Sequence, residues 1–155
     1  MLPENILEKI ENMEKRTLEI IEEITSDVDS VFRVNKAKLN AELIATISQN
    51  QRLVSNLSFY KTKVKAAYRK KQVVYNDLLE KINNGEVSRP DGKKRTFTNI
   101  KERDTWIKSQ PEHILAESRI SCFEIIVEHI NTLMECCKNK AFVIRYLNSV
   151  QRLKE

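Results

Sequence analysis

No glycine or proline occurs between Asn35 and Gly85, and this absence limits the possible folds more than any other feature of the sequence. The whole chain of 155 residues contains two glycines and three prolines. Sandwiches, barrels and phosphate-binding βαβ units need many tight turns, and this sequence lacks the residues that form them. We therefore expect an all-α fold, organised as a single helical domain over residues 1–155.

The first segment, residues 4–24, is predicted to be a helix. Residues suited to a packed face recur every three or four positions from Ile6 to Ile24, as they do along a helix that packs on a neighbour. The polar run 26–30 predicts a break, because short polar side chains compete for backbone hydrogen bonds. Residues 1–30 form an acidic N-terminal arm, with nine acidic and three basic residues.

The second segment, residues 33–84, is predicted to be one long basic helix. Asn35 is suited to cap its start, and Asn83-Asn84-Gly85 is a typical helix end. Residues 31–75 contain ten basic residues and one acid, Glu42. An acidic arm joined to a basic middle indicates either an anionic partner or attraction between copies of the chain.

An apolar register with a period of 3.5 residues runs along this helix from Leu39 to Leu78, interrupted by Asn50 and Lys71. A straight helix of this length would measure about 73 Å, whereas a compact chain of this size is roughly 40 Å across. Either the helix bends near Asn50 or Ser55, or neighbouring subunits cover its apolar stripe. We favour the second, and expect Leu53, Leu57 and Val64 to take part in oligomerisation.

The remaining sequence is predicted to be a loop, 85–98, followed by a C-terminal helical region with a hairpin-like arrangement, 99–155. Asn99 and Glu102 have the spacing of a capping box, which predicts a short helix to about residue 109. Pro111 is suited to the first turn of a helix that ends near residue 137. A final helix is expected over about 139–153.

Nothing in the sequence indicates an enzyme. His113 and His129 have no metal-ligand or catalytic spacing, and we expect them to be surface or packing residues. The odd cysteine count, with Cys136 and Cys137 adjacent, matches neither a disulfide framework nor a zinc site, and favours a reduced, cytosolic setting. We therefore expect no catalytic residues, no metal and no cofactor.

Membrane insertion and secretion are not expected either. No apolar run approaches the 18 residues of a membrane span. The N-terminus leads into an acidic segment, whereas a signal peptide has a basic stretch and then an apolar one.

The basic stretch is the strongest functional lead. From Leu43 to Asn76 there is no Asp or Glu over 34 residues, but there are seven cations. Cations interleaved with tyrosines suit single-stranded nucleic acid, because phosphates follow the positive surface while bases stack on the rings. A solvated face with tyrosines in the packing layer remains an alternative interpretation. The candidate DNA-binding residues are Lys61, Lys63, Lys65, Tyr68, Arg69, Lys70 and Lys71, with Lys93, Lys94 and Arg95 in the loop. Tyr75 is expected on the same broad face.

Several ordered segments resemble the phage recombination mediator family typified by UvsY. They are residues 35–42, the long basic helix ending at Gly85, the run Glu102-x-Asp104-x-Trp106-Ile107, and residues 139–146. The resemblance covers about residues 33–155. This chain departs from the family where it reads Tyr75-Asn76-Asp77, because its cations lie earlier on the same helix.

The resemblance implies a small all-helical protein that assembles as a homo-oligomer, in a ring of several subunits. It implies binding of single-stranded DNA and loading of a RecA-like recombinase in place of single-strand-binding protein, during phage recombination and repair in the cytoplasm of the infected bacterium. By position it assigns DNA binding to the segment from Lys61 to Lys71 and assembly to Phe142 and Ile144.

Two other functions are compatible with the sequence. One is a structural coiled-coil or scaffold oligomer without nucleic-acid binding, in which the acidic arm packs on a neighbour's basic helix. The other is a protein that binds anionic membrane surfaces, which the low aromatic content of the apolar face disfavours.

Overall fold

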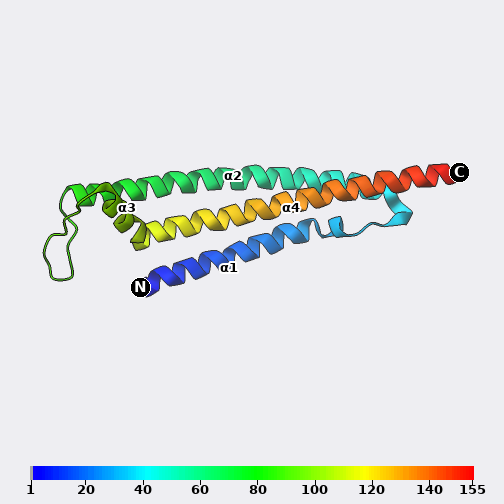
Figure 1. The fold of residues 1–155 in the computed structure, drawn as a ribbon. Coiled ribbons are helices and arrows are strands. Elements are labelled where there is room, and N and C mark those ends of the chain that lie inside the picture. The colour runs from blue at the N-terminus through cyan, green and yellow to red at the C-terminus, as the bar shows by residue number, and fades with distance from the viewer. Residues whose placement is uncertain (1) are drawn as a thin grey trace. The chain divides into compact units, whose positions relative to one another are not determined.

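The computed structural model describes residues 2–155, and the regular elements in that range are helices (Figure 1). They are α1 (Glu4–Asp27), η1 (Asp29–Phe32), η2 (Lys36–Lys38), α2 (Leu39–Asn83), α3 (Ile100–Ser109) and α4 (Pro111–Lys154), where η denotes a short 3₁₀ helix. The expected all-α fold is confirmed.

The helices contribute to two compact units. Unit 1 holds the chain up to Glu14 together with Lys63–Cys122, and unit 2 holds Lys15–Thr62 together with Phe123–Glu155. Each of α1, α2 and α4 therefore supplies one part to each unit.

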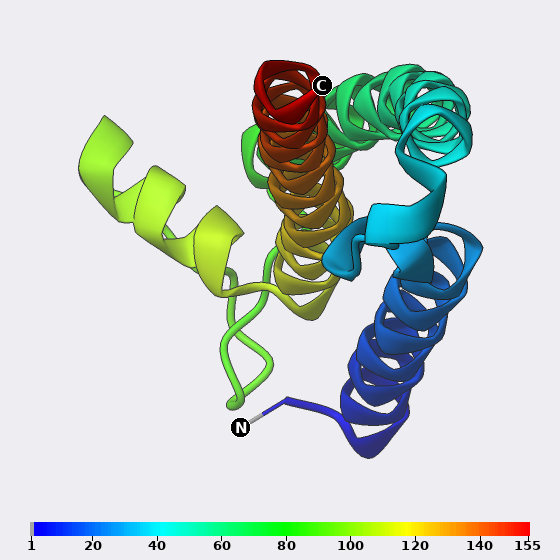
Figure 2. The same cartoon turned by 90° about the vertical axis from the view of Figure 1, so that its right-hand side faces the viewer.

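In unit 2, parts of α1, α2 and α4 run side by side (Figures 1 and 2). Their shared core consists of Ile24, Val28, Val31, Leu53, Ile126, Ile130, Leu133 and Cys137. Burying these apolar side chains supplies the main stabilisation of the unit. The polar residues that follow α1 end the helix as expected, and the chain then turns through η1 into this core.

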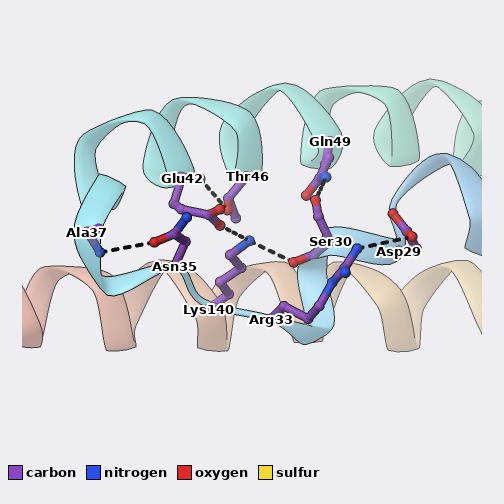
Figure 3. A network of polar contacts seen from close by, with 9 residues as sticks. All are labelled: Asp29, Ser30, Arg33, Asn35, Ala37, Glu42, Thr46, Gln49 and Lys140. Atoms are coloured by element: carbon purple, nitrogen blue, oxygen red, sulfur yellow. Dashed lines mark hydrogen bonds and ion pairs between the residues drawn. The ribbon is translucent and has the colours of Figure 1, made fainter.

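A buried lysine connects three elements of unit 2 (Figure 3). The side chain of Lys140, on α4, is only 2% exposed, and its Nζ lies 2.6 Å from Oε2 of Glu42 on α2. The same Nζ donates a hydrogen bond of 2.7 Å to the backbone carbonyl of Ser30 in η1. Gln49 of α2 donates to the hydroxyl of Ser30. A buried ammonium group is tolerated only with such partners, so the polar groups fix how these elements pack.

In unit 1, α2 ends as its sequence predicts. Gly85 has a φ of +67°. Its N–H donates to the carbonyl of Ile82, and the N–H of Glu86 donates to the carbonyl of Lys81. This pair of bonds is a Schellman motif, which satisfies the last carbonyls of the helix.

A short turn and a capped helix follow. Residues 87–95 fold back on themselves, with Arg95 N donating to Val87 O and Arg89 N donating to Lys93 O. The side chain of Asn99 then accepts a bond of 2.8 Å from the N–H of Glu102, which caps α3. Part of the expected loop is therefore a stable hairpin-like turn.

The C-terminal region differs from its prediction. We expected two helices, ending near residue 137 and starting near 139, but α4 is continuous from Pro111 to Lys154. Cys137, Lys140 and Ile144 are all buried along one side of this helix. The shared inward side and the absence of glycine or proline keep the helix unbroken.

The apolar stripe of α2 is also covered differently from our expectation. Leu53 is fully buried, and Leu57 and Tyr60 pack against the same core of unit 2. The chain's own α1 and α4 cover this part of the stripe, whereas we had favoured neighbouring subunits.

We predict that Lys140→Met lowers the free energy of unfolding by about 3 kcal/mol, because it leaves Glu42 and the Ser30 carbonyl without their buried partner. Urea denaturation measures the change. Lys138→Met, which removes an exposed cation from the same helix, serves as the control and should cost less than about 0.5 kcal/mol. Adding Glu42→Met to Lys140→Met should recover part of the loss, and equal losses for Lys140→Met and Lys138→Met would contradict the assignment.

Candidate nucleic-acid interface

The cations predicted to bind DNA lie exposed along α2. Lys61, Lys65, Arg69 and Lys70 are exposed, and within residues 2–155 none of them forms an ion pair. Lys61, Lys65 and Arg69 recur at intervals of four residues, which places them along one side of the helix. Lys63 is exposed as well. This part of α2 therefore presents positive charge to solvent.

The sequence explains why no acid on the same helix neutralises these cations. No acid lies within the segment Leu43–Asn76, so helical neighbours three or four positions away are never carboxylates. Glu42, the last acid before that segment, is already paired with Lys140.

Lys71 differs from the other cations. Its side chain is 32% exposed, and its Nζ lies 3.4 Å from Oε1 of Glu117 on α4. It also lies 5.9 Å from the ring centroid of Tyr68. Lys71 is therefore held against its own chain, and of the α2 cations it is the least available to a ligand.

The two tyrosines of this segment have different environments. Tyr68 is 49% exposed and can offer its ring to a base. Tyr75 is half-buried, and its hydroxyl donates a hydrogen bond of 2.9 Å to Asp104 on α3, which raises the pKa of Tyr75. The bond to Asp104 holds the Tyr75 hydroxyl against α3, so this ring is less accessible to a base than that of Tyr68.

The second predicted contact lies in the turn of unit 1. Lys93, Lys94 and Arg95 are exposed. The guanidinium of Arg95 lies 5.0 Å from the ring centroid of Phe97, a cation–π contact.

The predicted oligomerisation residues divide into two groups. Leu53 and Ile144 are fully buried within the single chain, so their assignment to an interface between subunits is not supported. Leu57 and Val64 are half-buried. Phe142 is 71% exposed and can contact another molecule.

Sequence reasoning missed a second apolar stripe on α2. Ile44, Ile47 and Val54 are 69%, 48% and 46% exposed, and they lie beside the buried register on the same helix. A groove of about 710 Å³ between α2 and α4 in unit 2 is bordered by Ile47, Met134 and other residues. Ile44, Ile47 and Val54 are three and seven residues apart, an interval that the sequence shows. The longer apolar register from Leu39 to Leu78 runs beside them on the same helix and is the stronger signal.

His113 is a buried titratable group of unit 1. Its side chain is fully buried, and neither ring nitrogen has a hydrogen-bond partner. Burial lowers the pKa of His113, which keeps the ring neutral near pH 7. The charged and titratable groups that face it are Glu117 on its own helix, Lys71 and Tyr75 on α2, and Asp104 and Lys108 on α3. His129 instead lies 2.8 Å from the hydroxyl of Thr25, so it packs between α1 and α4.

Nowhere in residues 2–155 do three His, Cys, Asp or Glu side chains gather to hold a metal ion. The described helices include none with the length and apolar character needed to cross a bilayer.

Comparison with known proteins gives no relative: no family model, no curated protein and no solved structure matches this chain.

The buried histidine predicts a pH dependence. Because its pKa is lower in the folded chain than in the unfolded one, the unfolded state binds a proton that the folded state does not. The free energy of unfolding should therefore fall as the pH drops below about 6.5, by at most about 1.4 kcal/mol per pH unit for this group.

Urea denaturation at several pH values measures this fall. His113→Leu should show a shallower fall, whereas His129→Gln should leave this contribution unchanged; an equal fall in His113→Leu and the wild-type chain would contradict the prediction.

Proposed function

We propose that this protein binds single-stranded DNA along the exposed cations of α2. The observation that carries the proposal is the set Lys61, Lys65, Arg69 and Lys70, which are exposed and form no ion pair in the described chain. Unpaired cations in a row attract a polyanion and release its counterions on binding. Tyr68, exposed among them, favours a single strand, because its unstacked bases can lie on an aromatic ring.

The wider role that we propose is that of a recombination mediator. Such a protein promotes loading of a RecA-like recombinase in place of single-strand-binding protein, during phage recombination and repair in the infected host's cytoplasm. The ordered resemblance over about residues 33–155 supports this role. The arrangement of an acidic helix, a long basic helix and a C-terminal helix agrees with it.

We further propose that several copies assemble, as a ring. The support comes from exposed apolar side chains in unit 2, namely Ile44 and Ile47 on α2, and Phe142 and Tyr146 on α4. Contacts between copies would remove these groups from water. Assembly would also add the phosphate contacts of several subunits on one strand, which raises affinity by avidity.

The triple variant Lys61→Ala, Lys65→Ala, Arg69→Ala tests DNA binding. It should weaken the binding of a labelled single-stranded oligonucleotide, and should reduce the slope of log affinity against log salt by up to about 2, since each phosphate contact contributes about 0.7. Fluorescence anisotropy over a salt series measures both quantities.

A matched control is Lys9→Ala, Lys15→Ala, Lys154→Ala, which removes the same charge from exposed positions outside residues 43–76. It should have a much smaller effect. Unchanged affinity and slope in the α2 variant would show that these cations do not bind DNA.

Assembly is tested by Phe142→Glu. Because Phe142 is exposed, the variant should stay folded while its sedimentation coefficient and its DNA affinity decrease. Ile144→Glu should instead unfold unit 2, since Ile144 is fully buried, and circular dichroism distinguishes the two effects. A folded Phe142→Glu protein with unchanged sedimentation would argue against this surface.

The alternative function is a structural scaffold without nucleic-acid binding. The exposed apolar side chains would serve it equally well, for example Ile44 at 69% and Phe142 at 71% exposure. It predicts no DNA affinity even at about 50 mM salt, where phosphate contacts are strong.

A further inference from the structure

A second concave surface lies in unit 1, away from the cations of α2 in the sequence. It is a groove of about 400 Å³ whose lining includes Arg95, Asn99, Lys101, Glu102 and Trp106. This volume falls within the range of small-ligand sites. Neither the resemblance nor the sequence interpretation gave Trp106 or Lys101 a role.

The aromatic side of the groove is held in place by stacking. Trp106 and Phe97 have ring centroids 5.8 Å apart at an angle of 66°, an edge-to-face arrangement. The guanidinium of Arg95 lies over the ring of Phe97, 5.0 Å from its centroid. Trp106 is half-buried, so part of the indole borders the groove and is open to a ligand.

The charges of the groove favour an anion beside this ring. Arg95 and Lys101 are exposed, and neither forms an ion pair in the part of the chain that the structure describes. Glu102 is the opposing charge, but Oε2 of its carboxylate accepts bonds of 2.9 Å and 2.6 Å from the N–H and hydroxyl of Thr98. These bonds lower the pKa of Glu102 and keep its carboxylate turned to the helix start. The positive charges of Arg95 and Lys101 are therefore available to an anionic ligand.

We infer that this groove binds one nucleotide of a single strand, with the base stacked on Trp106 and a phosphate held by Arg95 and Lys101. The inference rests on the proposed function and adds a second contact site, on the turn and α3. A flat ring beside two cations matches a nucleotide, which joins a flat base to an anion. An acidic peptide supplies the anion without the flat group.

Trp106 is the one tryptophan of the chain, so its fluorescence reports on this groove alone. Stacking of a base on the indole should quench that fluorescence when unlabelled single-stranded oligonucleotide is added to the full chain. An oligonucleotide of the same length made of abasic sugar-phosphate keeps the charge and removes the bases. When each oligonucleotide is present at a saturating concentration, the abasic one should quench the Trp106 fluorescence much less than the normal one.

Variants provide a second measurement. Trp106→Phe keeps an aromatic ring against Phe97 but presents a smaller surface, and Trp106→Ala removes the ring. Affinity for the oligonucleotide should fall by about tenfold in Trp106→Ala and by less in Trp106→Phe, as expected for one stacked base. Phe32→Ala, at an aromatic side chain that is 59% exposed in unit 2, is the control and should bind like the wild-type chain.

The outcomes separate this inference from the proposed function. If anisotropy shows that a labelled oligonucleotide binds, but Trp106 fluorescence and the affinity of both Trp106 variants stay unchanged, the groove inference is wrong and the proposed function stands. If no oligonucleotide binds at low salt, both are wrong. Quenching by a polyglutamate peptide but not by the oligonucleotide would make the groove a site for acidic protein segments and overturn the inference.

Discussion

The ion pair between Lys140 and Glu42 is the polar contact that joins the elements of unit 2. Lys140 is buried, and its ammonium contacts both the Glu42 carboxylate and the Ser30 carbonyl, so α4, α2 and η1 share one polar centre (Figure 3). A buried charge without partners costs several kcal/mol, which makes alternative packings of these elements unfavourable. The pair also takes up the only acid between residues 31 and 75.

The exposed charge of α2 follows from its sequence, because the segment Leu43–Asn76 contains no acid. The exposed cations at positions 61, 65, 69 and 70 therefore have no carboxylate three or four positions away on their own helix. Lys71 forms an ion pair with Glu117 of α4 within unit 1. Like charges along one helix repel each other, so the free chain carries an electrostatic cost that a bound polyanion would relieve.

Local signals in the sequence predicted the end of α2 and the start of α3, but not the start of α2, which follows the short 3₁₀ helix η2 at Leu39. The Asn99 cap and the Gly85 terminus depend on neighbouring residues, and both occur as expected. The register of α2 identified the inward side, but it did not show what covers that side. Leu53 is covered by the chain's own helices, and Lys140 lies inward on a continuous α4 where a break was expected. Such outcomes depend on tertiary packing, which spacing along the sequence does not encode. For the candidate site, the exposure of Lys61, Lys65 and Arg69 agrees with their spacing, but the bond between Tyr75 and Asp104 could not be predicted, because it joins residues 29 positions apart.

Our central proposal is that Lys140 serves the packing of unit 2 as a buried cation, whereas the exposed cations of α2 bind nucleic acid. Lysine acetylation under native conditions, read by mass spectrometry with and without a single-stranded oligonucleotide, tests it most directly. We expect Lys140 to be unreactive in both samples, and Lys61, Lys65 and Lys70 to react rapidly in the free chain and slowly in the complex. Rapid labelling of Lys140, or unchanged labelling of the α2 lysines in a sample shown to contain bound oligonucleotide, would contradict the account.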